Sequence, residues 1–202
     1  MKTGLLSAFA TALALCTALP ASAITIELNP SSQSVSVGST TTVDLVISGL
    51  GDGSAPSLGT FDLDVGFDPA VLDFSGATFG NQLDLFGFGD LQFVTPGVGT
   101  VNLFELSLES ITDLDTLQTG SFVLATLSFD ALASGSSALS IAVNALGDSL
   151  GDPLEAEVTG GTIRSVGDVS PVPEPASLPL VGIGILSMVA LAMRRRRKIA
   201  GD

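Results

Sequence analysis

The sequence predicts an all-β fold: one β-sandwich, flanked by an N-terminal export signal and a single C-terminal transmembrane helix. Three observations lead to this prediction. Short segments through the middle of the chain alternate apolar and polar residues, which is the period of a half-buried strand. Turn signals, many of them among the 23 glycines, separate these segments. Long apolar runs occur only at the two ends of the chain.

The composition excludes several classes of function. The 202 residues carry a net charge of −14 and include no His, Trp or Tyr. Without His, neither a Ser-His-Asp site nor a Cys-His site can form, and imidazole cannot bind a metal. The acidic charge repels nucleic-acid phosphates, and a sugar-cleaving pair of carboxylates would lack Trp or Tyr beside it. We therefore expect no enzymatic activity and no nucleic-acid partner.

Residues 1–23 have the features of a signal peptide. A basic residue precedes an apolar run that is too short to span a bilayer, and Ala21 and Ala23 are the small residues that signal peptidase accepts. The exported chain is then expected to begin at Ile24. Cys16 is the only cysteine and is removed with the signal, so the mature chain can form no disulfide.

The C-terminal end predicts a membrane span. Residues 167–177 form a linker rich in Gly and Pro. Residues 178–193 carry no charge, and with their apolar neighbours they reach about 27 Å as a helix, enough for a bilayer core. The tail 194–202 begins with cations, which place it in the cytoplasm by the positive-inside rule. These cations are Arg194, Arg195, Arg196, Arg197 and Lys198.

Pro173, Glu174 and Pro175, followed by the apolar helix and the arginine cluster, resemble the PEP-CTERM sorting signal of Gram-negative bacteria. Each proline keeps the residue before it extended, so this motif is an extended peptide beside the membrane. The resemblance implies recognition by an exosortase, a membrane protease-like enzyme, and then release or transfer to the cell surface or extracellular matrix. It also implies a host that produces exopolysaccharide. A plain single-span anchor with a proline-rich stalk is the alternative.

Residues 24–166 are predicted to form the sandwich. In the clearest strand, residues 61–68, apolar side chains face inward and the acidic ones between them face outward. Residues 79–89 are expected to form an irregular loop whose apolar side chains fill the core, with an exposed adhesive edge as the alternative. Further strands are expected at 24–28, 35–37, 43–47, 71–74, 91–95, 101–108, 121–130, 138–144 and 155–164.

Four motifs of this region resemble the cohesin domain, in the same order along the chain. Val-x-Val-Gly occurs at 35–38, Asp-Pro-x-x-Leu at 68–72, Leu-Ala-x-Leu-x-Phe at 124–129 and Gly-x-Ser-x-Leu at 135–139. The resemblance covers residues 24–166. It implies a jelly-roll sandwich of about nine strands, related in fold to cellulose-binding modules.

The same resemblance implies a function and a binding face. Cohesins bind dockerins through one sheet face, and Asp62 stands where an acidic cohesin residue takes part in that contact. Thr60 stands where better-known cohesins carry Asn, and Asp64 shares the outward side of the same predicted strand. We therefore expect a protein-interaction module with a dockerin-like partner. Binding of carbohydrate, such as exopolysaccharide, is the alternative function.

The exported part of the chain is strongly acidic. Residues 24–176 hold 20 acidic residues, all except Asp202, against the single cation Arg164, a net charge of −19. Most of these carboxylates are expected to be solvated. An ordered Ca²⁺ is the alternative, but no complete ligand loop occurs, so we expect no cofactor. The pairs with suitable spacing are Asp62 with Asp64, Asp113 with Asp115 in an expected loop at 110–119, and Asp148 with Asp152.

Overall fold

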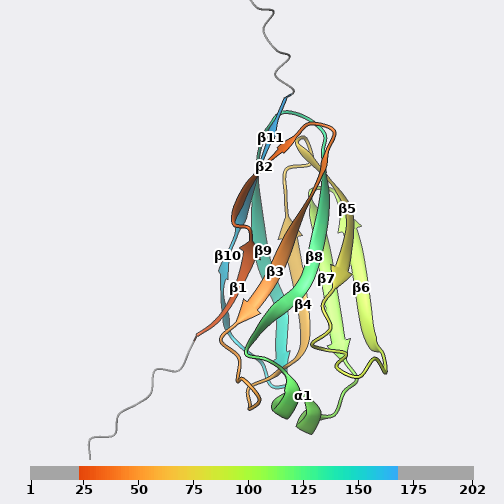
Figure 1. The fold of residues 1–202 in the computed structure, drawn as a ribbon, viewed down its shortest axis with the longest axis vertical. Coiled ribbons are helices and arrows are strands. Elements are labelled where there is room, and N and C mark those ends of the chain that lie inside the picture. Colours follow the sequence, from red (N-terminus) through yellow and green to blue (C-terminus); the bar gives the residue numbers. More distant parts are fainter. Residues whose placement is uncertain (1–22, 168–202) are drawn as a thin grey trace, which may run out of the picture. The chain divides into compact units, whose positions relative to one another are not determined.

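The computed structural model describes residues 23–167, which form two β-sheets packed face to face (Figure 1). This part of the chain contains eleven strands and one short helix. The arrangement confirms the predicted all-β sandwich. Figure 1 shows the helix at one end of the sandwich and the strands β2 and β11 at the other.

The five-stranded sheet has the order β10-β1-β3-β8-β5, and the six-stranded sheet has the order β2-β11-β9-β4-β7-β6. The elements are β1 (Ile24–Asn29), β2 (Ser32–Ser36), β3 (Thr40–Ser48), β4 (Leu58–Gly66), β5 (Leu72–Phe79), β6 (Asp90–Gly97), β7 (Thr100–Ser107), α1 (Ile111–Leu117), β8 (Ser121–Ala131), β9 (Gly135–Asp148), β10 (Ala156–Thr159) and β11 (Gly161–Val166).

The two sheets bury alternate residues against each other in one core. On β4, Phe61, Leu63 and Val65 are fully buried, as the sequence predicts. On the facing sheet, Phe129 of β8 is also fully buried, and its ring lies 5.3 Å from that of Phe67. Each large apolar side chain buried in this way contributes about 1.5–3 kcal/mol. The core therefore holds the sheets together without disulfides.

The segment expected as one strand at 155–164 is instead two strands in different sheets. β10 pairs with β1, whereas β11 pairs with β9 and β2. The chain crosses between the sheets at Gly160, where a Cβ would lie 2.3 Å from the carbonyl oxygen of Leu139. Only glycine fits there, and this crossing raises the number of strands above the number expected.

Helix α1 stands where the sequence predicts a loop. Ser110 is its N-cap residue, because its hydroxyl accepts a hydrogen bond from the backbone N–H of Asp113. Leu114 is its buried residue. Ile111, Leu114 and Leu117 do recur at helical spacing, but seven residues are too few for this spacing to distinguish a helix from a loop.

The loop at 79–89 fills the core with only part of its apolar side chains. Phe79 packs against the core beside Phe61, with ring centroids 6.1 Å apart, and Leu83 is buried. The prediction is wrong for Phe86 and Phe88, which are 51% and 84% exposed. The backbone N–H of Phe86 donates to Glu109, and the backbone N–H of Gly89 donates to Asp84. These two hydrogen bonds to carboxylates hold this part of the loop outward.

Within residues 23–167, no helix combines the length and the apolar character that crossing a bilayer requires. The predicted sorting motif, transmembrane helix and basic tail lie outside the described residues. So does the predicted signal peptide, except for Ala23.

Candidate interaction face

The outer face of the six-stranded sheet brings together the three residues predicted to bind a partner. Thr60, Asp62 and Asp64 lie on β4 and point away from the core, because successive side chains of a strand alternate. Each is half-buried, since β7 and β9 flank the strand. Their place on one face agrees with the prediction, and their role in binding stays a prediction.

Two asparagine amides hold the carboxylates of Asp62 and Asp64 in fixed positions. The Nδ2 of Asn102, on β7, donates to Asp62 Oδ1 at 2.6 Å and to Asp64 Oδ1 at 2.9 Å. The Nδ2 of Asn144, on β9, donates to Asp62 Oδ1 at 3.1 Å and to Asp64 Oδ2 at 3.0 Å. We call these four residues the carboxylate–amide cluster. A register shift between β4 and β9 at this point gives β9 the extra residue that reaches the cluster.

Only neutral side chains donate hydrogen bonds to the two carboxylates of the carboxylate–amide cluster in the described part of the chain. Amides are neutral, so their hydrogen bonds offset the repulsion between Asp62 and Asp64 without cancelling either charge. Asp62 Oδ2 takes part in none of these four hydrogen bonds. A positioned acceptor oxygen is therefore available to an N–H or ammonium donor of a partner.

An apolar strip lies beside the cluster on the same face. It consists of Leu91 and Phe93 on β6 and Phe104 and Leu106 on β7, with Phe104 directly opposite Asp62 of β4. Leu91 is 44% exposed and Phe93 is 58% exposed. The ring centroids of Phe93 and Phe104 lie 5.9 Å apart, so the two rings pack against each other within the strip.

Beneath the apolar strip, β7 buries a carboxyl group. Glu105 points into the sandwich and is 1% exposed, and its Oε1 accepts a hydrogen bond from Gln92 Nε2 at 3.0 Å. Burial raises the pKa of Glu105 to about 9, with further contributions from a hydrogen bond with Asp90 and from the negative charges of Asp90 and Asp84. Glu105 is therefore protonated and neutral at pH 7.

The other aspartate pairs with spacing suitable for calcium serve as hydrogen-bond acceptors. Asp115 Oδ1 accepts from the hydroxyls of Ser57 and Ser149, at 2.5 and 2.9 Å. Asp148 Oδ1 accepts from the backbone N–H of Asp152. In the described part of the chain, no group of three or more His, Cys, Asp or Glu could hold a metal ion.

Sequence reasoning identifies the carboxylates of this face but not their partners. Asn102 lies between the inward residues Val101 and Leu103, so the alternation of β7 already places it outward. Asn144 gives no such signal, because the register shift in β9 breaks the alternation there. The sequence does not predict which strands flank β4, and these neighbours decide which amides reach its aspartates.

Solved cohesin structures are similar to the sandwich. The sixth cohesin of scaffoldin B from Acetivibrio cellulolyticus, solved in complex with a mutant Cel5 dockerin, aligns with a TM-score of 0.58 at 19% identity. That alignment covers 71% of this chain and 99% of the cohesin. A non-cellulosomal cohesin from the archaeon Archaeoglobus fulgidus aligns with a TM-score of 0.55 at 18% identity. This alignment covers 71% of the present chain and 91% of the archaeal cohesin. At this level of identity the similarity shows the fold.

The C-terminal region matches a known family. Residues 171–197 match the PEP-CTERM protein-sorting motif. No curated protein matches the sequence significantly. The chain thus combines a cohesin-like β-sandwich with a C-terminal PEP-CTERM sorting motif, and both resemblances stated from the sequence are confirmed.

Proposed function

We propose that this is an exported, non-enzymatic protein of the cell surface or extracellular matrix, and that its sandwich binds a protein partner. The binding site is the outer face of the six-stranded sheet. One observation carries the proposal: this face joins the exposed apolar strip to the charged carboxylate–amide cluster. Protein interfaces combine exposed aromatic side chains with fixed polar groups in this way.

The partner that fits this face is a dockerin-like domain with basic residues. Cohesins with this fold have been solved in complex with dockerins, which supports the choice. Asp62 offers a free carboxylate oxygen at the centre of the face, and the chain around it is strongly acidic. Charge complementarity then accelerates association, so the on-rate should fall as salt screens the charges.

The sorting motif supports a route to the surface. Signal peptidase cleaves after Ala23, the helix at 178–193 holds the precursor in the inner membrane, and an exosortase acts at Pro173, Glu174 and Pro175. The host is a Gram-negative bacterium that produces exopolysaccharide. Replacing Pro173 and Pro175 by Ala in the native host should leave the precursor unprocessed and away from the surface. Normal processing and surface exposure of that variant would favour a simple anchor.

Capture from the secreted fraction of the host tests the binding face. The wild type is compared with Asp62→Ala, in the carboxylate–amide cluster, and with Asp130→Ala as a matched control. Asp130 is also a half-buried aspartate that accepts a side-chain hydrogen bond, from Thr40, but it lies on the outer face of the other sheet. We expect the wild type and the control to capture the same protein, and Asp62→Ala to lose most of it. Equal capture by all three would contradict the proposed face.

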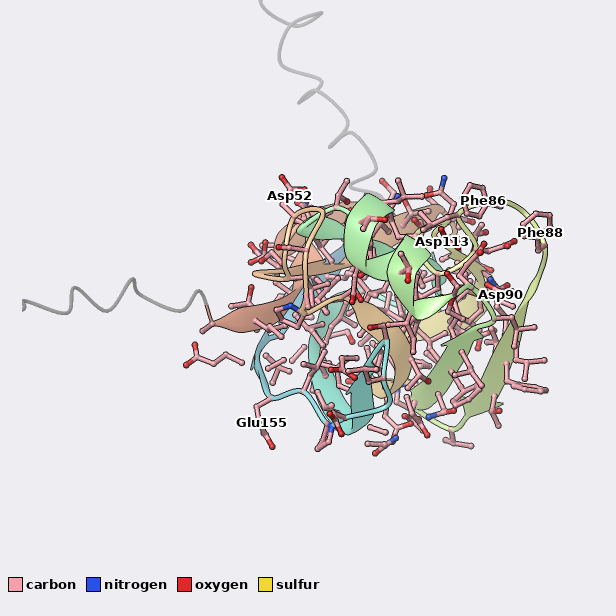
Figure 2. The ribbon with its side chains drawn as sticks, turned by 90° about the horizontal axis from the view of Figure 1, so that it is seen from below. Asp52, Phe86, Phe88, Asp90, Asp113 and Glu155 are labelled. Carbon is pink, nitrogen blue, oxygen red and sulfur yellow. The ribbon has the colours of Figure 1, made fainter. Side chains whose placement is uncertain are left out.

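A second candidate function, carbohydrate binding, is favoured by the exposed pair Phe86 and Phe88. Their ring centroids lie 5.8 Å apart, and Figure 2 shows both rings at the periphery of the sandwich. The backbone N–H of Phe86 donates to Glu109 Oε1, and that of Gly89 donates to Asp84 Oδ1, each at 3.0 Å. Two rings held outward in this way can stack on the apolar faces of sugar rings.

Affinity electrophoresis on the neutral glycans of the host distinguishes this function from the first. If the protein binds glycan through these rings, Phe88→Ala should abolish the retardation, and salt and Asp62→Ala should leave it unchanged. Retardation that persists in Phe88→Ala would exclude the aromatic pair as the glycan site. Recovery of one neutral glycan by both the wild type and Asp62→Ala, without any protein, would favour carbohydrate binding as the main function.

A further inference from the structure

The strand β6 forms one edge of the six-stranded sheet and is uncovered along its length. It pairs with β7 on one side, and within residues 23–167 no strand pairs with its other side. Every residue from Leu91 to Val98 is exposed. Figure 1 shows β6 at the lateral border of the sandwich, where the neighbouring edge strand, β5, belongs to the other sheet. The backbone groups on the free side of β6 therefore face solvent.

The other edges of the two sheets carry features that discourage pairing with a second chain. Short strands, charges and bulges all protect an edge in this way. β2 has five residues and is polar, and β10 has four and carries Glu157. β5 carries the exposed Asp73 and a register shift directly after it. β6, by contrast, pairs with β7 in unbroken register over eight residues, and its only charge is Asp90 at its first position.

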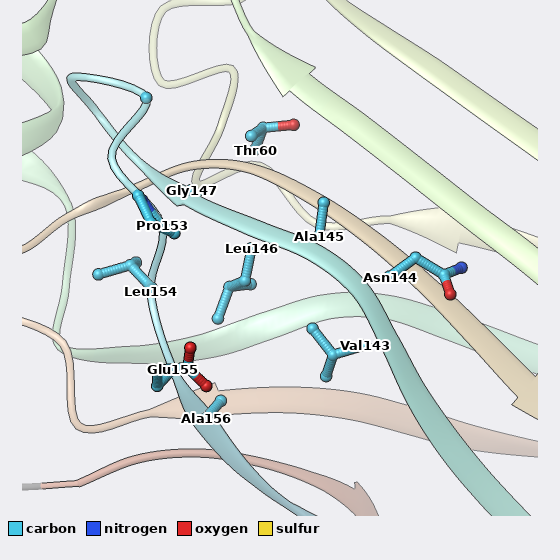
Figure 3. A pocket seen from close by; sticks show the side chains of 11 residues that line it. Thr60, Val143, Asn144, Ala145, Leu146, Gly147, Pro153, Leu154, Glu155 and Ala156 are labelled. Carbon is cyan, nitrogen blue, oxygen red and sulfur yellow. The ribbon is translucent and has the colours of Figure 1, made fainter.

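The strand β9, on the other side of this sheet, is covered. The segment 154–161, which includes β10, runs alongside β9 and is bonded to it at both ends. What remains open there is a pocket of about 460 Å³ between residues 143–147 and the segment 151–156 (Figure 3). No further strand fits beside β9, so β6 is where the six-stranded sheet can be extended.

The β6–β7 hairpin determines which backbone groups of β6 point to the free side. Its two-residue turn at 98–99 makes Gly97 a hydrogen-bonded position of the ladder. Because such positions alternate along an antiparallel ladder, Gln92 and Val94 direct their N–H and C=O groups away from β7. Pro96 belongs to the same alternate set, where its missing N–H costs no hydrogen bond to β7.

We propose that two copies of this chain pair through β6, so that their six-stranded sheets join into one continuous sheet. The two strands run antiparallel around a two-fold axis at Phe93, which closes the assembly at a dimer. In this register Gln92 of each copy lies opposite Val94 of the other, and their free N–H and C=O groups pair. Phe93 meets its own counterpart in a non-hydrogen-bonded pair, where side chains lie closest. The inference goes beyond the proposed function, because it needs no other protein.

Charge favours a second copy over a basic partner at this edge. The exported chain has a net charge of −19, yet residues 91–104 contain no charged side chain. A basic segment therefore finds no carboxylate along this strand, whereas two acidic chains approach each other here with the least repulsion. The exposed fractions of Leu91, Phe93 and Val94 are 44%, 58% and 37%. Pairing of two copies removes part of this apolar surface from water, which stabilises the dimer.

The paired sheet leaves the proposed binding face accessible. A two-fold axis perpendicular to the sheet places both copies of Phe93 on the same outer side, so the two apolar strips become neighbours. The carboxylate–amide cluster lies on β4, β7 and β9 rather than on β6, so each copy keeps its own cluster open. The dimer thus presents two faces side by side.

Sedimentation equilibrium of the full-length chain in neutral detergent measures the association. We expect a monomer–dimer equilibrium that tightens as NaCl is added, because salt screens the repulsion between two acidic chains. Val94→Lys places a charge on the free edge and should weaken dimerisation roughly tenfold or more. Val158→Lys makes the same change at another exposed valine of an edge strand, β10, and should leave dimerisation unchanged. Circular dichroism of both variants verifies that they remain folded.

Cysteine cross-linking tests the register. Cys16 is the only cysteine of the chain, so Cys16→Ser provides a background without thiols. In that background Phe93→Cys should form disulfide-linked dimers on mild oxidation, because the two-fold axis brings this position against itself. Val158→Cys, the matched control on β10, should remain monomeric under the same oxidation.

The proposal is overturned if the full-length chain stays monomeric at every concentration and salt, or if Val94→Lys dimerises as tightly as the wild type. Equal cross-linking of Phe93→Cys and Val158→Cys would show that the contact is not specific to β6. Hydrogen exchange gives a second measurement. The backbone N–H groups of Gln92 and Val94 should gain protection as the chain dimerises, and protection that requires another protein instead would assign this edge to a partner.

Discussion

The outer faces of the two sheets differ, although their inner faces share one core. Apart from the paired Val46 and Val123, the five-stranded sheet faces outward mainly with short hydroxyl and carboxylate side chains that bond to one another across the strands. These hydrogen bonds join Thr25 to Ser48, Thr40 to Asp130 and Thr126 to Asp44. The six-stranded sheet faces outward with the apolar strip and the carboxylate–amide cluster.

The difference between the two outer faces bears on the proposed binding face. Short polar side chains that satisfy one another are stable in water and need no partner. Phe93 and Leu91 are exposed, and contact with another surface would lower the free energy by removing their apolar surface from water. The comparison therefore supports the proposed binding face on the six-stranded sheet, and substitutions in both sheets test it.

The largest effect is expected where the two sheets depend on each other. Phe67 is buried and its ring packs edge-on against Phe129 of the facing sheet. Phe67→Ala should lower the free energy of unfolding by about 3–5 kcal/mol, since it leaves a cavity between the sheets. Urea denaturation followed by circular dichroism measures this loss. A change below about 1 kcal/mol would show that the sheets do not share this part of the core.

The buried carboxyl under the apolar strip makes stability depend on pH. Between pH 4.5 and about 9, Glu105 is ionised in the unfolded chain and protonated in the folded one. The folded state then binds more protons, so stability from this group falls as pH rises, by at most about 1.4 kcal/mol per pH unit. Below this window the group contributes no pH dependence.

Glu105→Gln tests this assignment, because the amide is neutral at every pH and has nearly the same shape. Urea denaturation from pH 5 to pH 9 should give a smaller decline for the variant than for the wild type. Parallel declines would show that Glu105 ionises normally in the folded protein. Because Glu105 lies on β7, this measurement reports on the sheet that carries the proposed binding face.

A smaller effect on stability, but a large one on binding, is expected in the apolar strip. Phe93→Ser removes an exposed ring, so the free energy of unfolding should change by no more than about 0.5 kcal/mol. Affinity for the captured partner should fall roughly tenfold or more, as for an aromatic residue at the centre of an interface. Isothermal titration with the purified partner measures it. Unchanged affinity would place the contact elsewhere.

The smallest effect on binding is expected on the outer face of the five-stranded sheet. Thr126→Ala removes a hydrogen bond of 2.6 Å to Asp44 Oδ1 and should cost about 0.5–1.5 kcal/mol of stability. Binding of the partner should not change. A loss of binding in this variant would show that the partner contacts both sheets, and the distinction between the two faces would then be wrong.

The sequence predicts the inner faces far better than the outer ones. Alternation along 61–68 places Phe61, Leu63 and Val65 in the core correctly, because burial depends on each strand's own pattern. The carboxylate–amide cluster needs Asn102 and Asn144 from two other strands, and only the order of the strands brings them together. Helix α1, whose buried residue is Leu114, is too short for its apolar spacing to distinguish it from a loop.

The exposed rings of the 79–89 loop escape prediction for a related reason. Isolated aromatic residues in a loop usually pack under it. Here Glu109, distant in sequence, accepts the backbone N–H of Phe86 and holds the loop outward. Gly87 and Gly89 have φ angles of 69° and 104°, which other residues rarely adopt and which allow the turn. The glycines are visible in the sequence, but the contact with Glu109 is not.

The strands that complete the two sheets come from opposite ends of the sandwich sequence. β1 pairs in parallel with β10, and β2 pairs in parallel with β11. β10 and β11 are the last two strands of the sandwich. Neither pair can therefore form until the end of the sandwich sequence, up to Val166, is available for pairing. Contacts between such distant parts of a chain make folding slow. If the chain is exported as proposed, slow pairing of these terminal strands keeps the chain unfolded for longer before it crosses the membrane.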